Sequence, residues 1–233
     1  TAAALAAAGS RVIALDLAAA CDAGPAVDAV TYVPTDVTDE AQVRAAVAVA
    51  SEDPQSPLRV VVNCAGVGMS ARILGRGGVH DLALYRKIIE INLIGSFTVL
   101  AIAAQAIAAT EPDAQGQRGV VINTASIAAY DGQVGQAAYS SSKGGIVGLT
   151  LPAARDLAQH GIRVMTIAPG IIETPMLATV SDEFRAGLAA GVPFPQRLGR
   201  PEEYAALAMA IIGHDYLNGE VIRMDGALRM APR

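Results

Sequence analysis

The sequence predicts an α/β fold: a single-domain, doubly wound (Rossmann-like) parallel sheet with helices on both faces. Apolar runs such as residues 120–122 lack polar alternation, which is typical of parallel strands buried on both faces. These strand-like runs alternate with helix-like stretches, the order expected for a parallel sheet. Of the 233 residues, 52% are hydrophobic, which is enough for one large core.

The chain opens on what resembles the end of a helix. Residues 1–8 are rich in alanine, and Gly9 follows at a position where helices commonly end. A chain that starts there lacks the first strand and the glycine-rich turn that binds a cofactor pyrophosphate. That strand lies in the middle of a doubly wound sheet. We therefore expect the protein to begin roughly 15 to 25 residues earlier.

The second strand of the fold is expected at residues 11–16 and ends in the carboxylate of Asp16. An acid at this place hydrogen-bonds the adenosine ribose hydroxyls and repels a 2′-phosphate. Neither Lys nor Arg occurs between Asp16 and Arg44 to bind such a phosphate. The interpretation is a preference for NAD over NADP, and the alternative is a solvated Asp at a strand end.

A third strand is expected at residues 30–37, and Thr38 is the expected N-cap of a helix over residues 39–50. The next strand, residues 58–63, leads into the small, turn-prone residues Asn63, Cys64, Ala65 and Gly66. Such residues let the backbone approach a cofactor closely, and a purely structural tight turn is the alternative.

Residues 67–80 contain four glycines and no clear periodicity, so we expect a mobile loop beside the substrate opening. A long helical region follows at residues 81–109. Its apolar positions lie on several faces, which suggests burial against another subunit. Asn92 within it is expected to be a satisfied buried amide at a local distortion of the helix.

The stretch from Gly119 to Gly148 carries the candidate chemistry. Ser126 follows a predicted buried strand, at the carboxyl end where parallel sheets bind ligands. Tyr139 and Lys143 are four residues apart, which puts them on one face of a helix. A nearby ammonium would lower the pKa of the tyrosine and suit it to proton transfer, while the serine hydroxyl fixes the substrate oxygen. The alternative is an exposed Tyr–Lys pair without a function.

The remaining elements follow the same alternation. We expect a helix from Tyr139 to about His160, loosened at Pro152, then a strand over residues 163–168. Residues 171–200 combine prolines, glycines and apolar side chains, and they are interpreted as a substrate lid. Its apolar side chains include Met176, Leu177, Phe184 and Phe194. A helix beginning at Pro201, a last strand over residues 219–225 and a tail over residues 227–233 that reaches a neighbouring subunit complete the prediction.

Composition limits the possible partners. The net charge is −5 and no basic cluster is evident, which disfavours nucleic acid and anionic membranes. No apolar run of about 18 residues free of charge was expected, so no membrane span is predicted. Cys21 and Cys64, the latter at an expected buried strand end, cannot form a disulfide framework, which favours a cytoplasmic protein with reduced thiols. The three histidines are scattered, so no metal is assigned.

Four segments resemble the short-chain dehydrogenase/reductase family: NTASIAAYDGQVGQAAYSSSKGGIVGLTLPAARDL, GIRVMTIAPG, VPFPQRLG and LNGEVIRMDGALRM. The resemblance implies a homotetramer and a catalytic group of Ser126, Tyr139, Lys143 and Asn92, with Asn92 holding a water in a proton relay to Lys143. It implies substrate contacts from Ser126, Gln136 and Tyr139. It also implies NAD contacts from Asp16, Asp36, Val37, Asn63, Ala65, Gly66, Tyr139, Lys143, Pro169, Gly170, Ile172 and Thr174.

Within that family the resemblance is closest to members that act on 3-hydroxyacyl-CoA, also described as 17β-hydroxysteroid dehydrogenases. The implied reaction is NAD-dependent interconversion of a secondary alcohol and a ketone. Two other enzymes remain open: a 3-oxoacyl-carrier-protein reductase, which Asp16 disfavours, and a steroid or general alcohol dehydrogenase. A non-catalytic scaffold subunit is the alternative from another class, although Ser126, Tyr139 and Lys143 are all intact.

Overall fold

The computed structural model describes residues 1–24, 26–174 and 181–232. Its strands are β1 (Val12–Asp16), β2 (Val30–Pro34), β3 (Val60–Asn63), β4 (Leu74–Gly75), β5 (Gly78–Val79), β6 (Gly119–Thr124), β7 (Ile162–Pro169) and β8 (Val221–Met224). Its α-helices are α1 (Ala2–Ala7), α2 (Ala18–Ala23), α3 (Glu40–Ala50), α4 (Leu82–Ile89), α5 (Ser96–Ala108), α6 (Ala137–Ala158), α7 (Asp182–Ala190) and α8 (Pro201–Ile212). A π-helical turn, Glu90–Gly95, joins α4 to α5, and a 3-10 turn, Ile127–Ala129, follows β6.

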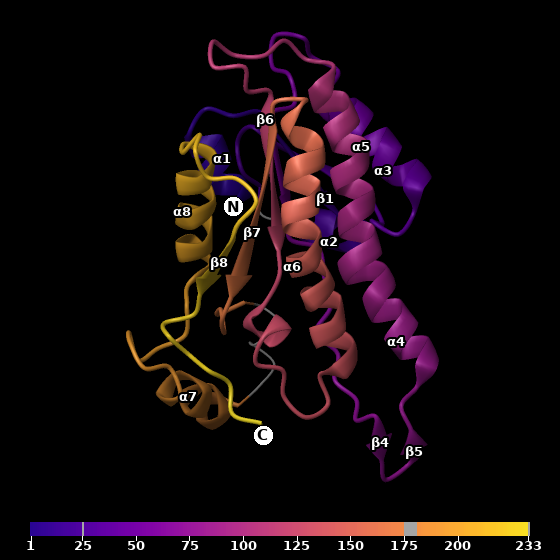
Figure 1. The fold of residues 1–233 in the computed structure, drawn as a ribbon, viewed down its shortest axis with the longest axis vertical. Coiled ribbons are helices and arrows are strands. Elements are labelled where there is room, and N and C mark those ends of the chain that lie inside the picture. The colour runs from indigo at the N-terminus through magenta and orange to yellow at the C-terminus, as the bar shows by residue number, and fades with distance from the viewer. Residues whose placement is uncertain (25, 175–180, 233) are drawn as a thin grey trace.

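The predicted doubly wound parallel sheet is confirmed. Strands β3, β6, β7 and β8 pair in that order, all parallel, while β1 and β2 form a second parallel pair. Because the strands are parallel, their carboxyl ends lie at one edge, which is the lower edge in Figure 1. Within the described residues no ladder joins β1 to β3. The first strand was expected at this position, but an earlier start of the chain stays a prediction.

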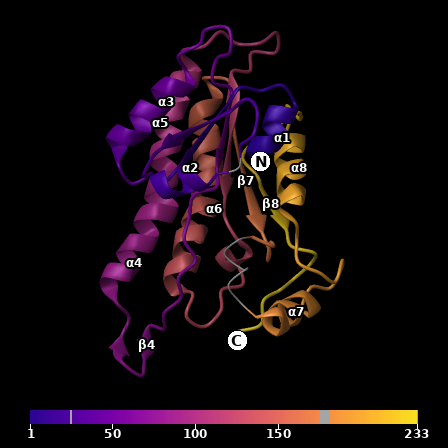
Figure 2. The ribbon, with the colours of Figure 1, turned by 180° about the vertical axis from the view of Figure 1, so that it is seen from behind.

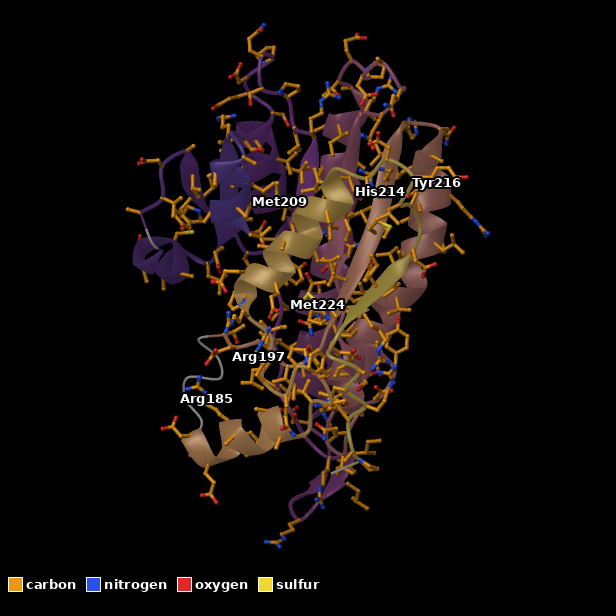
Figure 3. All side chains as sticks on the ribbon, turned by 90° about the vertical axis from the view of Figure 1, so that its left-hand side faces the viewer. Arg185, Arg197, Met209, His214, Tyr216 and Met224 are labelled. Atoms are coloured by element: carbon orange, nitrogen blue, oxygen red, sulfur yellow. The ribbon has the colours of Figure 1, made fainter. Side chains whose placement is uncertain are left out.

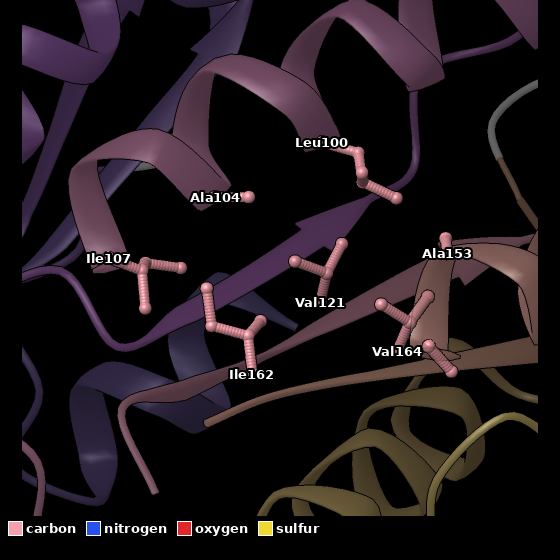
Figure 4. Packing of buried hydrophobic residues seen from close by; sticks show 8 residues of the cluster. Leu100, Ala104, Ile107, Val121, Ala153, Ile162 and Val164 are labelled. Atoms are coloured by element: carbon pink, nitrogen blue, oxygen red, sulfur yellow. The ribbon is translucent and has the colours of Figure 1, made fainter. Parts of the chain in front are cut away.

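Two apolar clusters fix the layers. On one face α5 and α6 pack against β6 and β7 through residues such as Leu100, Ile107, Val121 and Val164, as Figure 4 shows. On the other face α8 packs against alternate residues of the same strands, such as Ile122. Successive strand side chains point to opposite faces, so an unbroken apolar run serves both clusters. Figure 2, from behind, shows the same arrangement of helix, sheet and helix.

Several local predictions need correction. The N-cap of α3 is Asp39, whose carboxylate accepts hydrogen bonds from the backbone N–H groups of Ala41 and Gln42. Thr38 was expected to cap this helix, but its hydroxyl donates to Asp36 instead. Strand β2 also ends at Pro34 rather than at residue 37, because its pairing with β1 stops where β1 ends.

The segment expected to be a mobile loop, residues 67–80, contains the short hairpin of β4 and β5. Gly78 adopts a φ of 107° in it, a conformation that favours glycine. The hairpin projects beyond the lower edge of the sheet beside the start of α4 (Figure 1). The mobility of this segment stays a prediction.

The long helical region is interrupted as expected at Asn92, where the π-helical turn separates α4 from α5. The expectation that no charge-free apolar run reaches about 18 residues is wrong, because residues 91–110 contain no charge. By length and composition the helical stretch Leu82–Ala108 could cross a membrane. One such helix is weak evidence, since a core helix of a soluble protein passes the same test, and this one contributes Leu100 and Ile107 to the core.

The chain end packs on its own subunit. The backbone N–H of Val134 donates to the carbonyl of Pro232 at 3.0 Å, and the Gln133 amide donates to Ala231 at 2.9 Å. Arg223 joins the same region by an ion pair with Asp131 at 2.7 Å. The described part of the tail therefore lies against the loop that follows Ser126, and a contact with a neighbouring subunit stays a prediction.

Candidate active site

The site is built at the carboxyl ends of β3, β6 and β7. Ser126 lies two residues beyond β6 and caps the 3-10 turn, with its hydroxyl oxygen accepting a hydrogen bond from the N–H of Ala128 at 3.1 Å. Its side chain is buried. Because the turn fixes the backbone directly after the strand, the Ser126 hydroxyl is held at the edge where the sequence placed it.

Tyr139 and Lys143 lie one turn apart on α6. The Ser126 side chain lies close enough to the phenol of Tyr139 to lower the pKa of that phenol. The Lys143 ammonium lies 6.0 Å from the centre of the Tyr139 ring and donates to the carbonyl of Thr124 at 2.7 Å. Only 5% of Lys143 is exposed. The structure thus brings the three predicted groups into one cluster.

The expected lowering of the Tyr139 pKa is wrong for the free chain. Burial raises the pKa of Tyr139, and the hydrogen bond from Ser126 offsets this only in part. Burial also lowers the pKa of Lys143 to about 8, opposed by the nearby Cys64. The ammonium is directed to Thr124 rather than to the phenol, so desolvation dominates both pKa values.

Asn92 is a fully buried amide, as expected. Its Oδ1 accepts from the N–H of Val67 at 2.8 Å, and its Nδ2 donates to the carbonyl of Val67 and to the hydroxyl of Ser142, each at 3.0 Å. The carbonyl of Asn92 accepts a hydrogen bond from Ser96 at 2.9 Å. Asn92 therefore ties the π-helical turn to the segment after β3 and to α6, and its role in a water relay stays a prediction.

The predicted cofactor residues on β1 and β3 reach the same edge. Asp16 is exposed at the end of β1, and its Oδ1 accepts from the N–H of Leu17 at 2.8 Å. Asn63 is buried and bridges two strands, because its amide donates to Asn123 at 2.9 Å. Ala65 and Gly66 beyond it are exposed. Cys64 is exposed too, which corrects the expected buried position: it lies just past the strand, at the open edge.

The other predicted cofactor residues divide into two groups. In the first group, one carboxylate oxygen of Asp36 accepts a hydrogen bond from the backbone N–H of Thr38. Val37 packs closely on Gly95, since a Cβ on Gly95 would lie only 2.7 Å from Cγ2 of Val37. Pro169, Gly170, Ile172 and Thr174 follow the end of β7. In this second group the backbone N–H of Gly170 donates to the carbonyl of Met224, and Ile172 forms an isolated parallel β-bridge with Gly199. Thr174 is exposed.

Gln136 lies three residues before Tyr139, and its side-chain oxygen accepts from the N–H of Gln133 at 3.0 Å. Its amide thus stabilises the turn that leads into α6, and a contact with substrate stays a prediction.

The described parts of the expected lid are anchored by ion pairs. Arg185 of α7 pairs with Glu173, and Arg197 pairs with Glu203 of α8 through two hydrogen bonds of 2.7 and 2.8 Å. The Arg197 guanidinium lowers the pKa of Glu203 to about 2. Figure 3 shows Arg185 and Arg197 along this segment. Phe184 and Phe194 are exposed, and the predictions for Pro175, Met176 and Leu177 lie outside the described residues.

The exposed edge fits a dinucleotide. Asp16 has a second carboxylate oxygen available for ribose hydroxyls. Lys143 has Thr124 as its acceptor among the described residues, which leaves two of its N–H donors for a further ligand. The backbone at Ala65 and Gly66 is open to close approach. The residues at this edge therefore match the two ribose ends of a nicotinamide cofactor.

Sequence reasoning missed two residues of the cluster. Thr124 supplies the carbonyl that binds Lys143, and its hydroxyl hydrogen-bonds Tyr204 of α8 at 2.7 Å. Ser142 is fully buried and bonds Asn92. Neither carries a sequence signal of its own, since one acts through its backbone and the other lies in a run of three serines.

Comparison with known proteins decides the family. The model of the short chain dehydrogenase family matches residues 1–184. The chain belongs to the short-chain dehydrogenase family. It is therefore an oxidoreductase of a family whose dehydrogenases use nicotinamide cofactors, and the cluster of Ser126, Tyr139 and Lys143 is the candidate active site of a short-chain dehydrogenase.

Several members of the family are similar over most of the chain. A Bos taurus protein named 3-hydroxyacyl-CoA dehydrogenase type-2 is 55% identical over 203 residues, which cover 86% of this chain and 77% of the relative. The Homo sapiens protein of the same name is 53% identical over the same shares. A crystal structure of 3-hydroxyacyl-CoA dehydrogenase type-2 from Mycobacterium avium superimposes with a TM-score of 0.90 at 43% identity, covering 99% of this chain and 90% of that one.

Proposed function

We propose that this short-chain dehydrogenase uses NAD to interconvert 3-hydroxyacyl-CoA and 3-oxoacyl-CoA. The observation that carries the proposal is the convergence of the Ser126 and Tyr139 side chains at the carboxyl end of β6, with the Lys143 ammonium 6.0 Å from the centre of the Tyr139 ring. Two hydroxyls that share one location can both bind a single carbonyl or alcohol oxygen. The names of the similar proteins support the acyl-CoA substrate and a place in fatty acid metabolism.

In reduction, Tyr139 gives its proton to the carbonyl oxygen of the substrate. Its raised pKa keeps the phenol protonated at neutral pH, so the proton is available. The Ser126 hydroxyl holds the same oxygen by a hydrogen bond and fixes its distance to the phenol. When bound, the nicotinamide supplies the hydride for reduction and accepts it in oxidation.

In oxidation, Tyr139 takes the proton of the alcohol and must first be ionised. The Lys143 ammonium is a nearby cation that favours the phenolate. Two of its N–H donors have no acceptor among the described residues and suit the hydroxyls of a ribose. Asn92 holds the segment after β3 in place through Val67. In this proposal the protein positions the reacting oxygen and transfers its proton to or from Tyr139.

NAD is proposed over NADP because the exposed carboxylate of Asp16 ends β1. A carboxylate there binds ribose hydroxyls and repels a 2′-phosphate. The sequence places no Lys or Arg between Asp16 and Arg44 that could offset the repulsion.

A cytoplasmic homotetramer is the proposed assembly. Apolar side chains remain exposed on the helical face, among them Ile94 and Phe97 near the π-helical turn and Leu151 on α6. Exposed apolar surface of this kind is typical of subunit contacts. Light scattering of the purified protein tests the subunit number, and a monomer at all concentrations contradicts it.

Absorbance of the reduced cofactor with acetoacetyl-CoA tests the activity. We expect NADH to be consumed much faster than NADPH, because Asp16 rejects the extra phosphate. Faster turnover with NADPH would overturn the cofactor proposal. Turnover of simple ketones or steroids without turnover of the thioester would overturn the substrate proposal. NADH binding without turnover of any ketone would support a non-catalytic subunit.

A further inference from the structure

Ser142 occupies a position between the two groups that carry the chemistry. It lies on α6 between Tyr139 and Lys143, and none of its surface is exposed. Its hydroxyl donates to the carbonyl of Tyr139 at 2.7 Å and accepts from Nδ2 of Asn92 at 3.0 Å. Ser142 therefore connects the turn of α6 that carries Tyr139 to the π-helical turn that carries Asn92.

The directions of these hydrogen bonds allow one orientation of the Asn92 amide. The Ser142 proton is directed to Tyr139, so its oxygen can only accept from Asn92. Val67 presents both an N–H and a carbonyl to the same amide. A flipped amide would set its oxygen against the Ser142 oxygen and against the carbonyl of Val67, and would leave the N–H of Val67 without its acceptor.

The space around the Asn92 amide is tight. A Cβ on Gly66 would lie 3.2 Å from Oδ1 of Asn92 and 3.5 Å from Nζ of Lys143. A side chain on Gly66 would thus contact both the amide of Asn92 and the ammonium of Lys143. A change in the orientation of Asn92 would alter the gap that Lys143 and the segment after β3 share.

We propose that Ser142 is a positioning residue of the active site, which locks the Asn92 amide and so sets α6 against the segment after β3. Its influence on the reaction passes through Asn92 and the placement of Tyr139 and Lys143. The effect on turnover rests on the proposed function, whereas the hydrogen-bond link does not.

The run of three serines supplies matched variants. Ser141 is exposed, so Ser141→Ala is the control for Ser142→Ala. We expect Ser142→Ala to lower kcat by roughly tenfold to a hundredfold, since a buried N–H of Asn92 loses its acceptor. The KM for NADH should change by less than about threefold, because Ser142 reaches no open surface. Ser142→Cys, which keeps a polar hydrogen at nearly the same volume, should recover part of the rate.

A double-mutant comparison separates positioning from general loss of structure. In an Asn92→Ala background, Ser142→Ala should cause little further loss of kcat, because the group through which it acts is gone. If the fold-loss of kcat in the double variant equals the product of the fold-losses in the two single variants, the proposal is overturned. Equal kcat values for Ser142→Ala and Ser141→Ala would overturn it as well.

Hydrogen exchange gives a readout that needs no activity. The N–H of Val67 is bonded to Asn92, so exchange in the peptide over residues 66–70 should accelerate in Ser142→Ala and stay unchanged in Ser141→Ala. Unchanged exchange in Ser142→Ala contradicts the link. If the wild-type protein does not turn over acetoacetyl-CoA, the proposed function is wrong. The hydrogen-exchange result still tests whether Ser142 positions Asn92.

Discussion

The two ends of strands β6 and β7 contrast sharply in chemistry. At the amino end, residues such as Val121 and Val164 are fully buried between α5 and α6 (Figure 4). Further along, the paired residues Asn123 of β6 and Thr166 of β7 are equally buried but polar, and Ile167 and Ala168 follow Thr166 before β7 ends. Both ends lie in one sheet with one register, so the difference reflects side-chain chemistry rather than backbone geometry.

The contrast shows that the polar end buries groups whose desolvation opposes folding. The Nδ2 atom of Asn123 is buried and has no hydrogen-bond partner within the described chain. The Lys143 ammonium is buried at the same end with a lowered pKa. Such groups cost free energy when they leave water, and the apolar end offsets that cost. The following variants test the division between stability at one end and chemistry at the other.

The largest effect is expected for Tyr139→Phe at the polar end. The change removes only the hydroxyl that transfers the proton, so turnover of acetoacetyl-CoA should fall by about 10²–10⁴-fold. NADH affinity and melting temperature should stay close to those of the wild type. Tyr216→Phe is the control, because Tyr216 is 96% exposed and lies outside the cluster. A Tyr139→Phe protein that keeps most of its activity would contradict the mechanism.

Ile107→Ala tests the apolar end. Ile107 is fully buried against Val121 and Ile162, so the cavity should lower the free energy of unfolding by about 2–5 kcal/mol. Turnover per folded molecule should not change. Ile73→Ala is the control, since 73% of Ile73 is exposed, and it should shift stability by less than about 0.5 kcal/mol. Denaturant unfolding and active-site titration measure the two quantities.

Lys143→Met is expected to lower turnover and yet stabilise the free chain. The pKa of Lys143 is about 8 in the folded state, below the ordinary 10.5, so the charged form is penalised by folding. The gain in the free energy of unfolding should be about 1–3 kcal/mol at pH 7. The penalty is full below about pH 8 and disappears as pH rises towards 10.5, so the difference between the proteins should shrink across that window. A less stable variant at pH 7 would show that the buried ammonium stabilises the fold.

The smallest effect is expected at the exposed rim of the polar end. Asp16→Ser removes the carboxylate that repels a 2′-phosphate, so the ratio of kcat/KM for NADH to that for NADPH should fall about tenfold. Asp22→Ser, at an exposed position on α2, should leave the ratio unchanged. An unchanged ratio in Asp16→Ser would show that Asp16 does not set the preference for NADH over NADPH.

The sequence alone indicated the parallel sheet, because unbroken apolar runs such as residues 120–122 are typical of strands that are buried on both faces. It also determined which side chains share the site, since Ser126 follows a strand and Tyr139 and Lys143 are four positions apart on a helix. Sequence spacing predicts such local relations well. It did not predict the N-cap of α3, because Thr38 and Asp39 are both residue types that cap helices. In the structure the Thr38 hydroxyl donates to Asp36, and Asp39 caps the helix.

Only the tertiary structure decided the electrostatics and the links between segments. Whether the pKa of Tyr139 lies above or below its ordinary value depends on the burial of its phenol, which the spacing of Tyr139 and Lys143 does not reveal. The spacing also does not reveal that the Lys143 ammonium donates to the carbonyl of Thr124. The bond between Asn92 and Ser142 joins residues fifty positions apart. Desolvation and long-range hydrogen bonds arise when distant segments pack together, so they become visible only in the folded chain.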